Sequence, residues 1–187
     1  MDDVAAWRKV RRAELIARRQ ALSPAERRAA SDAIERHLRA VLAERAPTVV
    51  SFYWPFRGEF GARRLIVDLL ALGWRAALPV VVQKKAPLEF RLWTPDAAME
   101  KGVWDIPVPR DGAAVVPQVV LAPVVGFDDA CYRLGYGGGY YDRTLVTISP
   151  RAFAIGVGFE FQRLDTIHPQ PFDQRLDMIV TETAIQR

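Results

Sequence analysis

The sequence predicts an α/β fold: a mostly parallel open sheet with helices on both faces, preceded by an N-terminal helical hairpin. Three observations support this fold class. Short β-branched and apolar runs alternate with segments whose apolar residues recur at helical spacing, which is typical of a layered α/β fold. Residues 119–125 are almost continuously apolar, as expected of a strand buried on both faces. Residues 4–44 are rich in Ala, Leu and Arg and contain no strand pattern.

The N-terminal hairpin is predicted from two arginine-rich helical segments. Residues 4–22 form the first, and the run Ser23-Pro24-Ala25-Glu26 ends it and starts the second. Ser23 can cap the new helix, Pro24 suits its first position, and Glu26 completes a capping box. The second helix runs to about residue 44, with an apolar stripe formed by Ile34, Leu38, Val41 and Leu42.

The remaining elements alternate between strand and helix. Residues 48–54 are β-branched and aromatic and predict a strand. Residues 61–72 carry a leucine-rich helical stripe, and Gly73 stands where a C-terminal cap is expected. Further strands are predicted at 74–82, 88–93, 119–125, 152–157 and 178–181, whereas the Pro- and Gly-rich residues 102–117 predict a loop.

Composition places the chain among globular proteins. It has 187 residues, of which 50% are hydrophobic and 26% charged. This balance excludes disorder as the main state, and the length fits a single domain spanning 1–187. No window approaches the roughly 18 uninterrupted apolar residues of a membrane span. The acidic start followed by arginines is unlike a signal peptide, and a lone cysteine excludes an internal disulfide, so we expect a cytoplasmic protein.

The net charge of +4 lies entirely in the N-terminal segment. Residues 1–45 hold eleven Lys/Arg and seven Asp/Glu, which leaves fifteen of each in the rest of the chain. A shell that binds nucleic acid would spread more widely. The local excess is compatible with nucleic acid, a phosphorylated ligand, or solubility alone.

The segment 127–143 stands apart from the rest of the sequence. It follows the apolar strand, precedes a helix, and holds four glycines in the five positions 135–139. Ligands of open α/β sheets bind at the carboxyl ends of strands, and bare N–H groups at a helix start form an anion cradle. Arg133 and Arg143 suit phosphate oxygens, and Asp142 is a hard oxygen ligand for magnesium.

The motif differs from known phosphate loops. It lacks the Gly-Lys-Ser/Thr ending of a P-loop, and its glycine spacing is not that of the dinucleotide fingerprint. A glycine-rich turn with packing tyrosines is the structural alternative. The added Arg, Asp and three Tyr side chains, Tyr136, Tyr140 and Tyr141, favour a binding site.

The run Arg133-Leu134-Gly135-x-Gly137-x-Gly139-Tyr140-Tyr141-Asp142 resembles the signature of the 5-formyltetrahydrofolate cyclo-ligase family. The basic first helix, Glu59 and the C-terminal Phe172-Asp173-x-x-x-Asp177 fall in the family's order, so the resemblance covers nearly the whole chain. It implies MgATP and 5-formyltetrahydrofolate as small-molecule substrates, with 5,10-methenyltetrahydrofolate, ADP and phosphate as products. ATP would phosphorylate the formyl oxygen, and N10 would then close the ring.

The resemblance also implies residue roles. ATP contacts would come from Arg8, Lys9, Arg12, Arg133, Leu134, Gly135, Tyr136, Gly137, Gly138, Gly139, Tyr140 and Tyr141. Folate contacts would come from Trp54, Glu59, Tyr136, Gly137, Gly138, Gly139 and Tyr140. Asp142 and Asp173 match the magnesium positions, and Arg133, Tyr140 and Asp142 would be catalytic.

Two positions depart from the family pattern. The family usually has Lys where Arg8 stands, and a one-residue shift would promote Lys9 instead. It often has Gly where Cys131 stands, and a positive φ there would be costly for Cys. We interpret Trp7, Trp74, Trp93 and Trp104 as packing residues.

Two other functions compete with the folate ligase. One is another phosphate-binding α/β enzyme, such as a sugar-phosphate isomerase, which would turn over without ATP. The other is a nucleic-acid-binding module that uses the basic first helix. We expect the ligase, acting as a monomer without a nucleic-acid or membrane partner.

Overall fold

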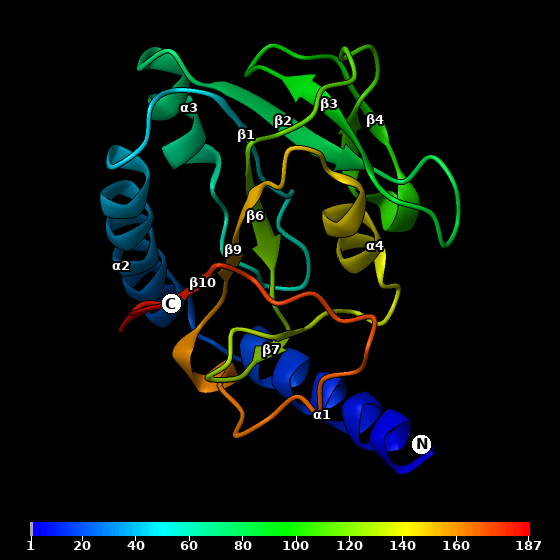
Figure 1. Ribbon diagram of the computed structural model, residues 1–187. Helices are drawn as coiled ribbons and strands as arrows, with labels where there is room; N and C mark the ends of the chain where they lie inside the picture. Colours follow the sequence, from blue (N-terminus) through cyan, green and yellow to red (C-terminus); the bar gives the residue numbers. More distant parts are fainter. Residues whose placement is uncertain (1) are drawn as a thin grey trace.

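A seven-stranded sheet with strand order β11-β10-β9-β6-β1-β2-β3 forms the centre of the computed structural model, which describes residues 2–187 (Figure 1). Neighbouring strands run parallel from β10 across to β2, and only the outer pairs β10–β11 and β2–β3 are antiparallel. The strands of the sheet are β1 (Val49–Ser51), β2 (Arg75–Val80), β3 (Glu89–Trp93), β6 (Val119–Pro123), β9 (Phe153–Val157), β10 (Met178–Val180) and β11 (Ile185–Gln186). The predicted mostly parallel sheet is therefore confirmed.

Helices cover both faces of the sheet, as predicted. Helices α2 (Pro24–Ala43) and α3 (Arg63–Ala71) pack on one face, where the largest hydrophobic core contains their apolar stripes together with Val119 and Leu121 of β6. Helix α4 (Tyr140–Thr147) lies on the other face, where its Leu145 packs with Val120 and Ala122. Successive β6 side chains thus enter opposite cores, which explains the continuous apolar run in the sequence.

The two N-terminal helices are present, and the predicted capping box joins them. The Ser23 hydroxyl accepts a hydrogen bond from the Glu26 amide (3.2 Å), and the Glu26 carboxylate accepts one from the Ser23 amide (2.9 Å). The helices do not run side by side as a hairpin. Helix α1 (Asp2–Gln20) crosses the end of the sheet near β7 (Gly126–Phe127), whereas α2 runs along the face of the sheet (Figure 1). They separate because arginines of α1 bind segments that follow the strands.

The loop predicted at residues 102–117 is wrong in part. Residues Pro107–Pro109 form β5, which pairs antiparallel with β4 (Met99–Lys101), and a 3₁₀ turn, η1 (Val103–Asp105), joins the two strands. Proline is tolerated in such a two-stranded ribbon because both strands are edge strands. The segment 102–117 therefore contains a strand and a 3₁₀ turn, although its Pro- and Gly-rich composition predicts a loop. The short strands β7 and β8 (Arg133–Leu134), η2 (Glu160–Gln162) and β11 were also not predicted.

The strand order creates a crevice at the centre of the sheet. From β1 the chain proceeds to β2 and β3 on one side, whereas from β6, the other neighbour of β1, it proceeds to β9 and β10 on the opposite side. The segments that follow β1 and β6 therefore diverge at the carboxyl ends of two adjacent strands. Ligands of open α/β sheets bind at such topological switch points.

Close packing of β9 against its neighbours predicts a sensitivity to small insertions. A Cβ at Gly156 would lie 2.5 Å from Ile179 Cδ1 and 2.7 Å from Leu176 Cδ1. We expect Gly156→Ala to lower the free energy of unfolding by about 1–3 kcal/mol through overpacking. The control is Gly61→Ala, whose Cβ would meet its nearest neighbour at an ordinary 3.6 Å. Urea unfolding measures both, and equal stabilities would contradict this account of the packing.

Candidate active site

A cavity of about 410 Å³ lies at the switch point, a volume typical of small-molecule sites. Its walls come from α1, the segment after β1, residues 103–108, the glycine-rich segment and residues 170–173. The structure brings together all but one of the predicted site residues, namely Arg8, Arg12, Trp54, Glu59, Arg133, Leu134, Gly135, Tyr136, Gly137, Gly138, Gly139, Tyr140, Tyr141, Asp142 and Asp173. The exception is Lys9, which is exposed on α1 and does not line the cavity.

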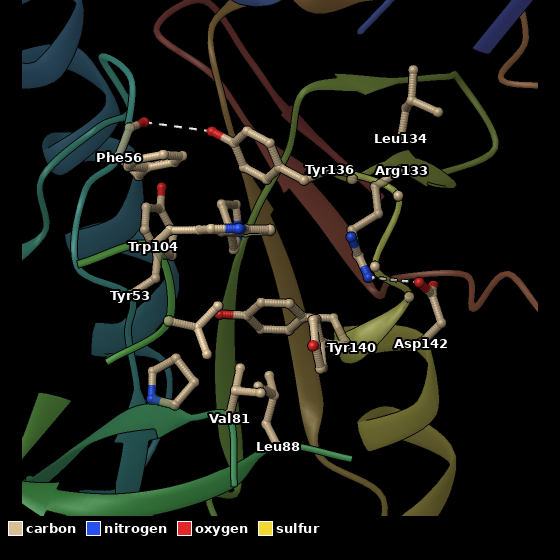
Figure 2. A pocket seen from close by; sticks show the side chains of 18 of the residues that line it. Tyr53, Phe56, Val81, Leu88, Trp104, Arg133, Leu134, Tyr136, Tyr140 and Asp142 are labelled. Atoms are coloured by element: carbon tan, nitrogen blue, oxygen red, sulfur yellow. Dashed lines mark hydrogen bonds and ion pairs between the residues drawn. The ribbon is translucent and has the colours of Figure 1, made fainter. Parts of the chain in front are cut away.

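The glycine-rich segment requires the backbone freedom of glycine at two positions. Gly137 has φ +95° and Gly139 has φ +63°, a region that other residues rarely adopt. Gly139 is the N-cap residue of α4, and it makes no side-chain capping hydrogen bond. The first N–H groups of α4 are therefore left for an anionic ligand. The side chain of Leu134 points away from the cavity (Figure 2), so contact with a ligand there falls to its main chain.

Arginines hold this segment in place and retain unused donors. Arg12 Nε donates to the Gly135 carbonyl (2.7 Å), and Arg143 donates to the Gly138 carbonyl. Arg133 forms an ion pair with Asp142 at 3.0 Å (Figure 2). The buried Nε atoms of Arg133 and Arg143 have no partner among residues 2–187. Arg133 also lines the cavity, where a guanidinium suits phosphate oxygens, whereas Arg143 does not line it.

The two predicted magnesium ligands share one side of the cavity. Asp173 forms a buried ion pair with Arg8 and accepts a bond from the Gln170 amide (2.7 Å). Asp142 accepts a bond from the amide of Gln174 (3.2 Å), the residue that follows Asp173. Of the two basic residues considered in α1, Arg8 lines the cavity and Lys9 does not.

The carboxylates of the cavity are few for a metal site made of protein ligands alone. The residues that the structure describes contain no group of three or more His, Cys, Asp or Glu able to hold a metal. Magnesium commonly takes only one or two carboxylates and completes its shell with water and phosphate oxygens. Asp142 and Asp173 fit that requirement as hard oxygen ligands, although each is paired with an arginine.

Glu59 faces the opposite end of the cavity. A turn with positive φ at Arg57 and Gly58 (+47° and +80°) directs its side chain inward, where it is 8% exposed. Its two oxygens accept bonds from the Phe56 amide and the Tyr136 hydroxyl, each at 2.8 Å. Burial raises the pKa of Glu59, and the nearby charge of Arg19 opposes that rise.

Aromatic side chains surround this carboxylate. Trp104 stacks on Phe56 with ring centroids 6.0 Å apart, and Tyr136 lies 5.8 Å from Phe56 (Figure 2). Trp104 lines the cavity and is 56% exposed, so its interpretation as a packing residue is wrong. Trp74 and Trp93 are buried in the main core, as predicted. The β4–β5 ribbon carries Trp104 to the cavity, and no local sequence signal reveals that placement.

Comparisons with known proteins agree with this geometry. The profile of the 5-formyltetrahydrofolate cyclo-ligase family matches residues 4–182. The chain belongs to this family. It is 27% identical to the 5-formyltetrahydrofolate cyclo-ligase of Haemophilus influenzae over 177 residues, covering 90% of this chain and 95% of the relative. It is 34% identical to that of Mycolicibacterium smegmatis over 140 residues, covering 71% and 72%.

Solved structures of this cyclo-ligase family share the fold. The 5,10-methenyltetrahydrofolate synthetase of Aquifex aeolicus superposes with a TM-score of 0.82 at 27% identity, covering 96% of this chain and 92% of that one. The synthetase of Mycoplasma pneumoniae gives 0.78 at 25% identity, covering 94% and 98%.

Cys131 stands where the cyclo-ligase family often has glycine, and its φ is +62°. The positive φ considered from the sequence is thus present, and it strains a non-glycine residue. The side chain is fully buried in a cluster with Phe127, Leu176 and Ile179. Burial also raises the pKa of its thiol. Both features oppose a nucleophilic role.

We therefore expect Cys131 to be inert toward a thiol reagent in the folded protein. Ellman's reagent should label about one thiol per chain in denaturant, but react far more slowly in native buffer, because a buried thiol with a raised pKa forms little accessible thiolate. Absorbance at the reagent's product band measures both rates. Equal rates in the two conditions would contradict the burial of Cys131.

Proposed function

We propose that this chain catalyses the ATP-dependent cyclisation of 5-formyltetrahydrofolate to 5,10-methenyltetrahydrofolate, with release of ADP and phosphate. One observation carries the proposal. A single cavity joins a glycine-rich segment flanked by arginines to a buried carboxylate among aromatic rings. The first feature suits a polyphosphate, and the second suits a flat heterocycle with N–H donors. Membership of the cyclo-ligase family supports the same activity.

The chemistry requires activation of a formamide. The formyl oxygen attacks the γ-phosphorus of ATP, a P–O bond forms, and the bond to ADP breaks. The carbon now carries a good leaving group. N10 attacks that carbon and loses its proton, and the C–O bond breaks to release phosphate. No protein nucleophile is required, so catalysis consists of positioning and charge neutralisation.

The phosphate end of the cavity performs most of this work. Residues 133–141 would surround the phosphates, while Arg8 and Arg12 approach from α1. Arg133 and Tyr140 would contact the transferred group beside Asp142. The positive charges would stabilise the phosphoryl oxygens as negative charge develops on them in the transition state.

Asp142 and Asp173 would hold magnesium together with the phosphates. Bound magnesium supplies further neutralisation of phosphate charge. Arg133 and Arg8, which now pair with these carboxylates, would turn toward the phosphates.

The folate end provides recognition. Glu59 would accept paired N–H donors of the pterin, since an ionised carboxylate can accept several hydrogen bonds. Trp54, Tyr136 and the glycine-rich segment would line the rest of the folate site. The pterin and the phosphates would thus bind at opposite ends of one cavity. The formyl oxygen would lie between them.

The direction of the α1 arginines argues against a nucleic-acid module. Arg8 and Arg19 are buried, and Arg12 binds a main-chain carbonyl of the glycine-rich segment, so these charges face the cavity and its supports. No helix among residues 2–187 is long and apolar enough to cross a membrane. We further propose that residues 1–187 act as one domain and as a monomer in the cytoplasm, where the single cysteine stays reduced.

Asp142→Asn should reduce turnover on the order of 10²-fold and raise the magnesium concentration needed for half-maximal rate, because it weakens a ligand to the metal. Formation of the methenyl product, followed by its near-ultraviolet absorbance, measures both. The control is Asp165→Asn, an exposed carboxylate outside the cavity. A wild-type magnesium dependence in Asp142→Asn would remove this residue from the metal site.

Glu59→Gln should raise the KM for 5-formyltetrahydrofolate about tenfold or more, because it removes hydrogen bonds to a charged acceptor. The KM for ATP should change far less, since Glu59 lies at the other end of the cavity. Initial rates with each substrate varied in turn make the comparison. Equal effects on both constants would argue against pterin recognition by Glu59.

A further inference from the structure

Arg19 is a fully buried arginine in α1, with 1% of its surface exposed. It lies behind the cavity wall rather than in it. A buried guanidinium is costly unless its donors are satisfied and its charge is matched. Its partners therefore indicate what its charge stabilises.

The guanidinium of Arg19 joins three segments that meet at the switch point. Its Nε donates to the Arg57 carbonyl (3.0 Å), in the turn that directs Glu59 inward. Its Nη1 donates to the Val124 carbonyl (3.2 Å), directly after β6. Its Nη2 donates to the Tyr136 hydroxyl (2.5 Å), in the glycine-rich segment. One side chain thus connects the segments that follow β1 and β6 to the glycine-rich segment.

These contacts also fix the direction of a hydrogen-bond chain. Arginine has donors but no acceptor, so the Tyr136 oxygen must accept from Arg19. The Tyr136 proton is then free to point at Glu59, whose Oε1 lies 2.8 Å away. Arg19 Nη2 is itself 3.7 Å from that Oε1, and it is the sole ion-pair partner of Glu59 among residues 2–187.

We propose that Arg19 is a positioning residue of the folate site: it orients the Tyr136 hydroxyl and keeps the Glu59 carboxylate an ionised acceptor for the pterin. This inference rests on the proposed function and adds a residue that never touches the substrate. It also explains why an arginine, rather than an apolar residue, occupies a fully buried position of α1.

The charged and titratable groups around Glu59 determine how folate binding should depend on pH. Arg19 faces the carboxylate from α1, and the tyrosines around it are Tyr136 from the glycine-rich segment, Tyr53 from the segment after β1, and Tyr141 from α4. The pKa values of these tyrosines are raised, so they stay neutral near pH 7. Without Arg19, only the hydrogen bonds from Phe56 and Tyr136 would oppose the effect of burial, and the pKa of Glu59 would rise further. Folate binding needs the ionised form, so it would then be lost at a higher pH as the solution is acidified.

The test compares Arg19→Gln, which removes the charge, with Arg19→Lys, which keeps the charge but loses the planar fork. Quenching of tryptophan fluorescence gives the Kd of 5-formyltetrahydrofolate from about pH 5 to about pH 9. In Arg19→Gln we expect the Kd to rise about tenfold at neutral pH, and the acidic limb of the profile to move up by about one pH unit. In Arg19→Lys the Kd should rise, while the acidic limb stays near its wild-type position.

Two controls separate positioning from stability. Arg27→Gln removes another guanidinium from the same turn, where Arg27 donates to the Gly58 carbonyl (2.5 Å) without lining the cavity. It should lower stability without moving the acidic limb. In a Glu59→Gln background the limb due to this carboxylate is absent, so adding Arg19→Gln should produce no further pH shift.

The outcomes distinguish this inference from the proposed function. If the wild-type protein does not bind 5-formyltetrahydrofolate, the proposed function fails. If it binds, and Glu59→Gln weakens binding, but Arg19→Gln leaves the acidic limb in place, only the role of Arg19 is overturned. If Arg19→Gln does not fold, Arg19→Lys decides, because a wild-type Kd in that variant would overturn the role of the fork.

Discussion

The site depends on arginines of α1 that point inward to main-chain oxygens beyond the ends of the strands. Arg8 binds the carbonyls of Ile167 and His168, Arg12 binds that of Gly135, and Arg19 binds that of Val124. These carbonyls belong to irregular segments that have left the sheet and lack ladder partners there. A helix laid across the end of the sheet satisfies them with long side chains. The same helix therefore completes the fold and forms one wall of the cavity.

This arrangement supplies cationic groups without leaving them unpaired. Arg8 and Arg133 each hold a carboxylate that lines the cavity, and Arg12 and Arg143 hold carbonyls of the glycine-rich segment. Because these contacts order the segment in the free protein, a ligand need not provide all of the ordering free energy. The arginines also lie close together, and burial with the nearby Arg8 charge lowers the pKa of Arg12. An incoming polyphosphate would relieve that repulsion.

Much of the candidate site was predictable because many of the residues that line it are contiguous in the sequence. Residues 133–142 combine strand end, glycines and helix start in one run, so local chemistry and family resemblance both identify them. Local sequence did not decide which residues outside this run line the cavity. Whether Arg8 or Lys9 enters the cavity depends on the rotation of α1 about its axis, which the structure fixes by burying Arg8 and exposing Lys9. Trp104 was not identified as a cavity residue because its proline- and glycine-rich neighbours predict a loop rather than the β4–β5 ribbon.

The sequence by itself determined the order of the helices and of the longer sheet strands, the burial of β6 and the glycine-rich segment, because these follow from local periodicity, capping and backbone freedom. It did not reveal the short strands β4, β5, β7, β8 and β11. Tertiary structure decided the path of α1 and the meeting of Arg19, Glu59 and Tyr136. Those three residues lie 40 and 77 positions apart along the chain. Their encounter depends on a strand order that brings β1 beside β6, and local sequence patterns carry no information about which strands become neighbours.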